Sequence, residues 1–205
     1  FSPISIGFLQ NMKPRCFEAF CDSGFSGKNL QILIDTMFPG FACEAESCSP
    51  FSPGPVEHGE EIGFLLINPL HYDEQRETVI PDAFQELLNR DLSVIRAKYS
   101  SKTEAQKTKD ELIRRGADRI PPKLRLIEEV CISSVSSVRE SIETYGQILG
   151  VFDTALEDKR GHASIFTKKE ALQKGPLRKK VRERIHAVMT KRVEPFATFI
   201  EKLPD

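Results

Sequence analysis

The stretch LRLIEEVCISSVSSVRESIETYGQILGVFDTAL, residues 124–156, carries the most regular apolar pattern in the chain. Its apolar side chains recur at steps of three or four residues, the spacing that places side chains on one face of an α-helix. This spacing predicts a single helix over 122–157 with a heptad seam that packs on other helices, as in a coiled coil. The expected helix-seam residues are Val138, Ile142, Tyr145, Leu149 and Phe152.

The segments on both sides of this stretch also favour helices. Pro81 suits the first turn of a helix, and Ser101–Glu104 and Thr167–Glu170 have the form of capping boxes, whereas Pro195 must interrupt a helix. Long helices joined by short polar turns predict an antiparallel bundle with a long helix hairpin over residues 81–205. The predicted helices are near 81–99, 102–116, 122–157, 167–194 and 196–203.

Residues 1–80 differ in composition from this predicted bundle. They hold 4 Lys or Arg and 11 Asp or Glu, whereas residues 81–205 hold 25 and 19. They also contain 9 of the 14 phenylalanines and 4 of the 5 cysteines, together with many prolines, which disfavour long helices. We therefore expect an acidic, irregular N-terminal region packed on the bundle, and a fold that is mainly α.

Within the N-terminal region, the apolar spacing predicts short helices over 14–20 and 27–38. The segments 4–9 and 61–67 share the sequence Ile-Gly-Phe-Leu and could pair as a small two-stranded sheet.

The cysteines allow a metal-site interpretation. Cys16 and Cys21, like Cys43 and Cys48, are separated by four residues, and four thiolates could hold zinc, with His58 as a substitute ligand. Closer cysteine spacings are more diagnostic, and small buried apolar cysteines explain the same pattern. We therefore expect reduced cysteines, no metal and no cofactor.

Motifs for catalysis are incomplete. A cysteine–histidine pair could be assembled from Cys21 and His71, but nothing in the sequence brings these residues together. Gly24–Gly27 lacks the residue between serine and the second glycine of the nucleophile elbow Gly-x-Ser-x-Gly. Gly27-Lys28 ends like a phosphate-binding loop, but Asp22 stands at the position of the earlier glycine and Asn29 replaces Ser or Thr. The sequence thus favours a non-catalytic protein, with an enzyme of unrecognised family as an alternative.

One segment is strongly basic. Residues 168–192 hold ten Lys or Arg and two Asp or Glu, although the whole chain has a net charge of −1. A helix starting at Pro176 would direct four of these side chains away from its apolar stripe, so they are candidates for binding an acidic partner. They are Lys179, Lys180, Arg184 and Lys191. The alternative is that this face is solvated or docks on residues 1–80.

These patterns predict a helical protein-interaction or scaffold module within a larger assembly, with a protein as its partner. Alternatives are a nucleic-acid or ribonucleoprotein component, or a protein of anionic membrane surfaces, that binds through 168–192. No apolar run has the length of a transmembrane segment. The low cysteine content favours an intracellular, cytoplasmic location, with organelle import after removal of a leader left open.

Overall fold

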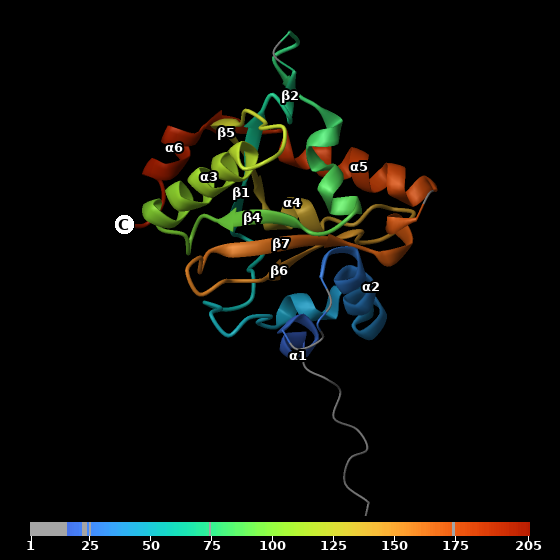
Figure 1. Cartoon of the computed structure of the whole chain (residues 1–205). Helices are drawn as coiled ribbons and strands as arrows, with labels where there is room; N and C mark the ends of the chain where they lie inside the picture. Colours follow the sequence, from blue (N-terminus) through green and yellow to red (C-terminus); the bar gives the residue numbers. More distant parts are fainter. Residues whose placement is uncertain (1–15, 22–23, 25, 74, 174) are drawn as a thin grey trace, which may run out of the picture.

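The computed structural model describes residues 16–21, 24, 26–73, 75–173 and 175–205. Its centre is a six-stranded sheet in the order β6-β7-β4-β1-β5-β8 (Figure 1), and all neighbouring strands in it are antiparallel. The strands are β1 (Glu61–Asn68), β4 (Leu92–Arg96), β5 (Leu126–Ser134), β6 (Leu149–Asp153), β7 (His162–Thr167) and β8 (Val193–Pro195). A separate antiparallel pair consists of β2 (Tyr72–Asp73) and β3 (Thr78–Val79).

Helices cover both faces of the sheet. One face packs on α4 (Val135–Arg139), α5 (Pro176–Met189) and the 3-10 helix η2 (Pro81–Leu88), and η3 (Lys169–Leu172) leads from β7 to α5. On the other face, α3 (Lys102–Ala117) and α6 (Phe196–Glu201) cover β1 and β5. On that same face, α1 (Cys16–Cys21), α2 (Gly27–Met37) and η1 (Pro39–Ala45) cover β6 and β7.

The strand register shows that these last two groups of helices share one face. Ile95 of β4 lies opposite Gly63 of β1 and His162 of β7, so the three residues face the same side. In the view of Figure 1, α3 lies above β4 and β7, and α1 and α2 lie below them, so the two groups cover different parts of this one face. Ser93 of β4 is exposed although its strand is central, because neither group of helices covers this part of the face.

The predicted mainly α fold, with its helical bundle and coiled coil, is wrong. Residues 122–157 form β5, α4 and β6 rather than one helix. Apolar residues outside the expected seam, such as Val130, Ile132 and Val151, are buried as well, so these strands are covered on both faces. A strand buried on both faces shows no clean alternation, and a subset of its apolar residues can then match a helical period.

The expected seam residues do not form one surface. Val138 lies in α4, and Ile142 and Tyr145 lie at a turn in which Ile142 pairs with Gly146. Leu149 and Phe152 are both buried in β6, but they belong to different core clusters. They are three positions apart in a strand, so their side chains point to opposite faces of the sheet.

The other predicted helices have mixed outcomes. The segment 81–99 forms η2 followed by β4, and the segment 167–194 contains η3, α5 and the start of β8. Residues 102–116 do lie in a helix, α3, which opens with a complete capping box. The Ser101 hydroxyl accepts from the Glu104 backbone N–H, and the Glu104 carboxylate accepts from that of Ser101.

The N-terminal region is joined to the rest of the fold through β1. The segment 61–67 is a strand as expected, but it lies between β4 and β5 at the centre of the large sheet. Its expected partner, 4–9, lies outside the described residues. The change in composition near residue 80 therefore does not coincide with a division of the sheet.

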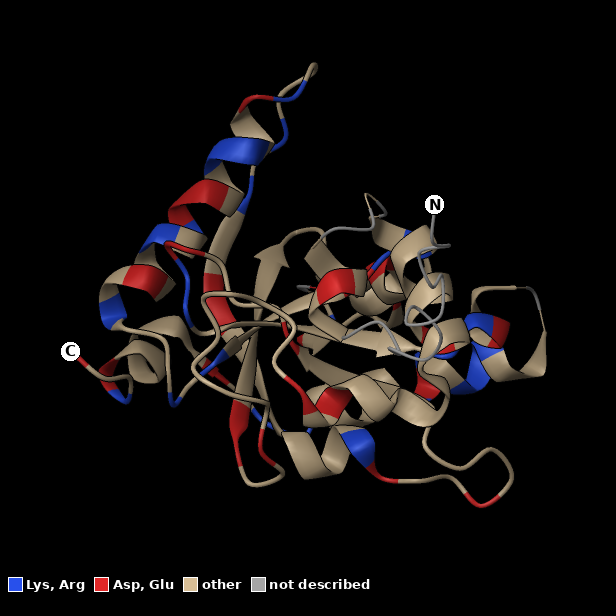
Figure 2. Cartoon of the chain, turned by 90° about the horizontal axis from the view of Figure 1, so that it is seen from below, with Lys and Arg blue, Asp and Glu red and all other residues tan. Residues whose placement is uncertain are grey.

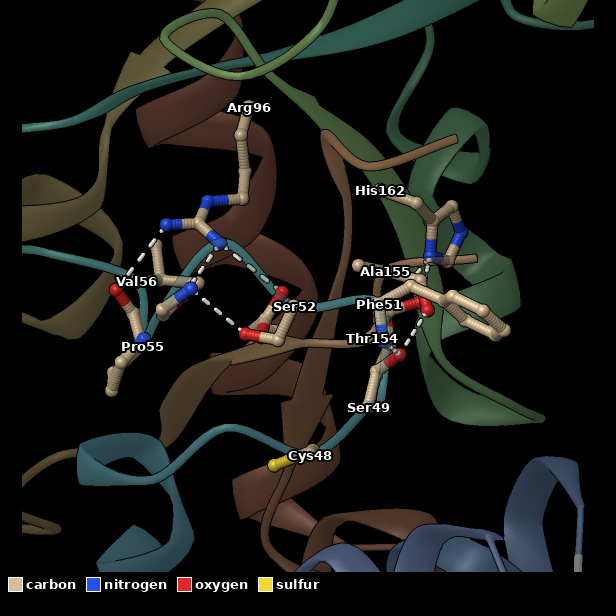
Figure 3. Close-up of polar contacts among 12 residues, drawn as sticks. Cys48, Ser49, Phe51, Ser52, Pro55, Val56, Arg96, Thr154, Ala155 and His162 are labelled. Atoms are coloured by element: carbon tan, nitrogen blue, oxygen red, sulfur yellow. Dashed lines mark hydrogen bonds and ion pairs between the residues drawn. The ribbon is translucent and has the colours of Figure 1, made fainter. Parts of the chain in front are cut away.

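A fully buried arginine fixes the loop that precedes β1. Arg96 donates to both carboxylate oxygens of Glu60 at 2.7 and 2.8 Å, and to Asp153 at 3.1 Å. It also donates to the backbone carbonyls of Gly54 and Pro55 at 2.8 and 3.2 Å (Figure 3). Burial raises the pKa of Glu60, but the hydrogen bonds and charge of Arg96 outweigh it, so that pKa lies below its ordinary value. Arg96 thus ties β1, β4, β6 and the loop together.

Candidate anion-binding pocket

A cavity of about 360 Å³ lies between α3 and the sheet, and it extends to the part of the face around Ser93 that no helix covers. Its volume is within the range of small-molecule sites. Apolar side chains of β1, β4 and α3, together with one from the turn before β7, form much of its wall. They are Leu65, Ile67, Ile95, Ala105, Leu112 and Leu156. The cavity can therefore hold the apolar body of a small molecule.

The charged residues that line the cavity are unequal in number. Five are basic and three are acidic. Arg90 pairs with Glu86 at 2.7 Å, and Lys159 pairs with Glu111. Arg115 also lies 4.0 Å from Glu111. The remaining two basic residues, Arg119 and Arg125, have no carboxylate within ion-pair distance among the described residues, so this end of the cavity is positively charged.

Arg125 is the unusual member of this group because only 9% of it is exposed. Its Nη1 donates to the backbone carbonyl of Leu112 at 3.1 Å. Burial lowers the pKa of Arg125, and the positive charges of Arg119 and Arg115 lower it further, although Glu86 raises it. An arginine nevertheless stays protonated in proteins. A guanidinium that lines a cavity and has no carboxylate partner can bind an anion from solution through its charge and its N–H donors.

The backbone around α3 places this guanidinium at the cavity. Gly116 has no side chain, so the stem of Arg125 lies directly against the helix. The Gly116 carbonyl accepts from the backbone N–H groups of Arg119 and Lys123, which turns the chain back towards β5. Arg119 and Arg125 are thereby brought to the same end of the cavity.

His71 lines the same cavity as a neutral hydrogen-bond donor. Burial lowers its pKa to about 4, so the ring is uncharged at neutral pH. Its Nδ1 accepts from the Ile67 backbone N–H at 3.1 Å, and its ring stacks on Phe64 with centroids 5.4 Å apart. Because Nδ1 is the acceptor, the hydrogen-bond pattern assigns the single ring proton to Nε2.

His162 lines the cavity as well and has the opposite tautomer. Its Nδ1 lies 2.9 Å from the Thr154 carbonyl, which can only accept, so Nδ1 carries the proton (Figure 3). Burial lowers the pKa of His162 and leaves Nε2 as an unprotonated acceptor. The Thr154 hydroxyl continues the polar chain to the Ser164 hydroxyl at 2.9 Å, and Ser164 donates to Asp91 at 2.6 Å.

The basic residues expected to bind a partner lie on and just after α5, and none of them lines the cavity. Lys179 and Lys180 are exposed and lie 3.7 and 3.2 Å from Glu183. Arg184 is partly buried and donates to Glu140 and to the Ser137 carbonyl, each at 2.5 Å. Lys191 is exposed. Acidic residues are interspersed with basic ones over the molecule (Figure 2). Binding of an acidic partner by Lys179, Lys180, Arg184 and Lys191, called the α5 surface below, stays a prediction.

The expectation that the N-terminal cysteines are all reduced is wrong, because Cys16 and Cys43 form a disulfide. The pairing joins α1 to η1. Zinc binds cysteine as a thiolate, so the two bonded sulfurs cannot serve as zinc ligands. Among the described residues there is no cluster of three or more His, Cys, Asp or Glu suited to a metal ion. Within the same residues, no helix has both the length and the apolar character required to cross a lipid bilayer.

Sequence reasoning missed the residues that give the cavity its chemistry. The sequence relates His71 only to a cysteine, and no motif in it singles out His162. Arg125 stood inside the expected long helix, between Leu124 and Leu126. A charged residue within an apolar run was the only sequence signal that it had a special environment.

Comparisons of the chain with models of known protein families, with curated proteins and with solved structures find no match.

Proposed function

We propose that this protein binds a small oxyanion with an apolar body, such as a phosphate monoester or a carboxylate, in the cavity under α3. The observation that carries the proposal is the guanidinium of Arg125, a residue that is only 9% exposed, lines the cavity and has no carboxylate within ion-pair distance among the described residues. A planar guanidinium offers two parallel N–H donors, which match the oxygens of a phosphate or carboxylate.

The other lining groups support an oxyanion over a neutral ligand. Arg119 adds a second positive charge that no carboxylate in the described structure neutralises, and His71 adds a neutral donor at Nε2. The apolar side chains of β1, β4 and α3 favour an alkyl or aromatic body, because burying apolar area contributes roughly 25 cal/mol per Å².

Calorimetric titration with hexyl phosphate, hexanoate and hexanol tests the proposal. We expect binding of at least one anion and weaker binding of hexanol, and the two anions distinguish a phosphate site from a carboxylate site. Arg125→Gln should weaken anion binding about ten- to a hundredfold, since a charged hydrogen bond contributes roughly 1.5–3 kcal/mol.

Arg114→Gln is the control because Arg114 lies on α3, does not line the cavity, is exposed, and pairs with Asp118 at 3.5 Å. It should leave the affinity unchanged. Equal binding of hexanol and the anions, or equal effects of the two variants, would contradict an oxyanion site at Arg125.

A further inference from the structure

The cysteines of α1 and of the segment after α2 are arranged as two parallel pairs. Cys16 and Cys43 are bonded and lie 27 residues apart, and Cys21 and Cys48 have the same separation. The Cys21 thiol lies 3.6 Å from the Cys48 backbone carbonyl oxygen. We infer that Cys21 and Cys48 form a redox-active pair that closes into a second disulfide.

The existing disulfide makes closure of the second one favourable. It already holds α1 beside η1, so little further loop entropy is lost when Cys21 and Cys48 join. Cys131 differs from this pair because it lies in β5 and is buried in the core that β5 forms with α5. It is therefore a natural reference thiol.

The two thiols have different environments, which sets the order of the reaction. Cys21 is exposed, whereas Cys48 is buried. Burial raises the pKa of the Cys48 thiol, and the negative charges of Asp153 and Glu46 raise it further. Cys21 is therefore the thiol that reacts first with an external oxidant.

The oxidant can be a low-molecular-weight disulfide such as oxidised glutathione. The Cys21 thiolate attacks one glutathione sulfur, forms a mixed disulfide and releases one glutathione thiolate. Cys48 then loses its proton and attacks the Cys21 sulfur, and the second glutathione leaves as a thiolate. In total, two protein thiols are oxidised to one disulfide, and one glutathione disulfide is reduced to two thiols.

The segment after Cys48 connects this pair to the cavity wall (Figure 3). The Ser49 hydroxyl donates to the Ala155 carbonyl and accepts from the Phe51 backbone N–H at 3.1 Å. Ala155 follows Thr154, whose carbonyl holds His162. A Cys21–Cys48 bond would therefore anchor α1 to the segment that contacts the end of β6 beside His162.

The experiment equilibrates the folded chain, with its Cys16–Cys43 bond intact, in mixtures of oxidised and reduced glutathione. Remaining thiols are alkylated, and the protein is digested with a glutamate-specific protease. Cleavage at Glu18 separates Cys16 from Cys21, and cleavage at Glu44 and Glu46 separates Cys43 from Cys48. Trypsin, added as a second protease, cleaves after Lys28 and separates Cys21 from Cys43. The two disulfides thus give different linked peptides. We expect a peptide that joins Cys21 to Cys48.

Serine variants test the order of the reaction. Cys48→Ser should accumulate glutathione on Cys21, Cys21→Ser should leave Cys48 unmodified, and Cys131→Ser should behave like the wild type. Circular dichroism confirms that each variant is folded. If the wild type accumulates glutathione on Cys21 without forming the linked peptide, or if Cys48 reacts as readily as Cys21, the inference is overturned.

Discussion

Gly116 and Arg125 are packed so closely that a Cβ on residue 116 would lie 2.6 Å from Cγ and Cδ of Arg125. The same Cβ would lie 2.6 Å from the Lys123 backbone oxygen. The position of the Arg125 side chain at the cavity thus depends on a residue that has no side chain.

Gly116→Ala should therefore destabilise the protein and weaken anion binding. In an exposed part of a helix this change stabilises by about 1 kcal/mol, because alanine favours helices. Here the contact with the Lys123 backbone cannot be relieved by a rotamer change, so we expect a loss of about 1–3 kcal/mol. Urea unfolding measures it, with Gly59→Ala as the control, since a Cβ there meets nothing within 4 Å. Stabilisation by Gly116→Ala would contradict the packing.

His71 should make the stability depend on pH. Burial lowers its pKa to about 4 in the folded state, compared with about 6.5 when unfolded. Between these values only the unfolded state binds the proton, so stability is lost as the pH falls from 6.5 to 4. The loss amounts to about 3 kcal/mol.

The test is the unfolding free energy across this range in the wild type and in His71→Asn. The amide oxygen of asparagine can still accept from the Ile67 N–H. This variant should lose less stability on acidification than the wild type, whereas exposed His58→Asn should follow the wild type. Parallel curves for the wild type and His71→Asn would show that His71 is not buried as a neutral ring.

The buried Arg96 should be far more important for stability than an exposed ion pair nearby. Arg96→Met leaves the carboxylates of Glu60 and Asp153 without their cation, which should cost about 3–5 kcal/mol. Lys98→Met, which removes the exposed pair with Glu57, should cost no more than about 1 kcal/mol. Chemical denaturation of both variants measures the difference. Equal losses would contradict the claim that the buried ion pairs of Arg96 with Glu60 and Asp153 stabilise the fold.

The α5 surface should bind acidic polymers. The wild type is expected to bind polyglutamate with an affinity that falls as salt is added, and the triple change of Lys179, Lys180 and Lys191 to Glu should abolish it. Arg184 is kept because it contacts Ser137 and Glu140. The melting temperature of the triple variant should stay near that of the wild type, since exposed charges contribute little. Binding that is unaffected by the triple change would place the interaction elsewhere.

Local signals predicted local structure in part. The second expected capping box does not form, because Thr167 ends β7 and its hydroxyl donates to the Ile148 carbonyl. The helix α3 follows from its capping box at Ser101 and Glu104, two residues that interact within one turn. The strands β5 and β6 could not be recognised in this way. Phe64 of β1 pairs with Cys131 of β5, a partner far away in the sequence, and burial on both faces of β5 removes the alternation that would identify a strand.

The candidate site has the same non-local origin. Arg125 becomes a buried cation only because the chain turns back at Gly116 and places it under α3. His71 follows the end of β1, whereas His162 begins β7. Their tautomers depend on the backbone groups of Ile67 and Thr154. No spacing rule relates these residues in the sequence.

A crystal structure of the protein with hexyl phosphate tests the oxyanion site most directly. Phosphate oxygens should lie about 2.7–2.9 Å from the guanidinium nitrogens of Arg125, with the alkyl chain against Leu65 and Ile95 of the sheet. An empty cavity at a ligand concentration that saturates the calorimetric signal, or a phosphate bound only at α5, would contradict the account.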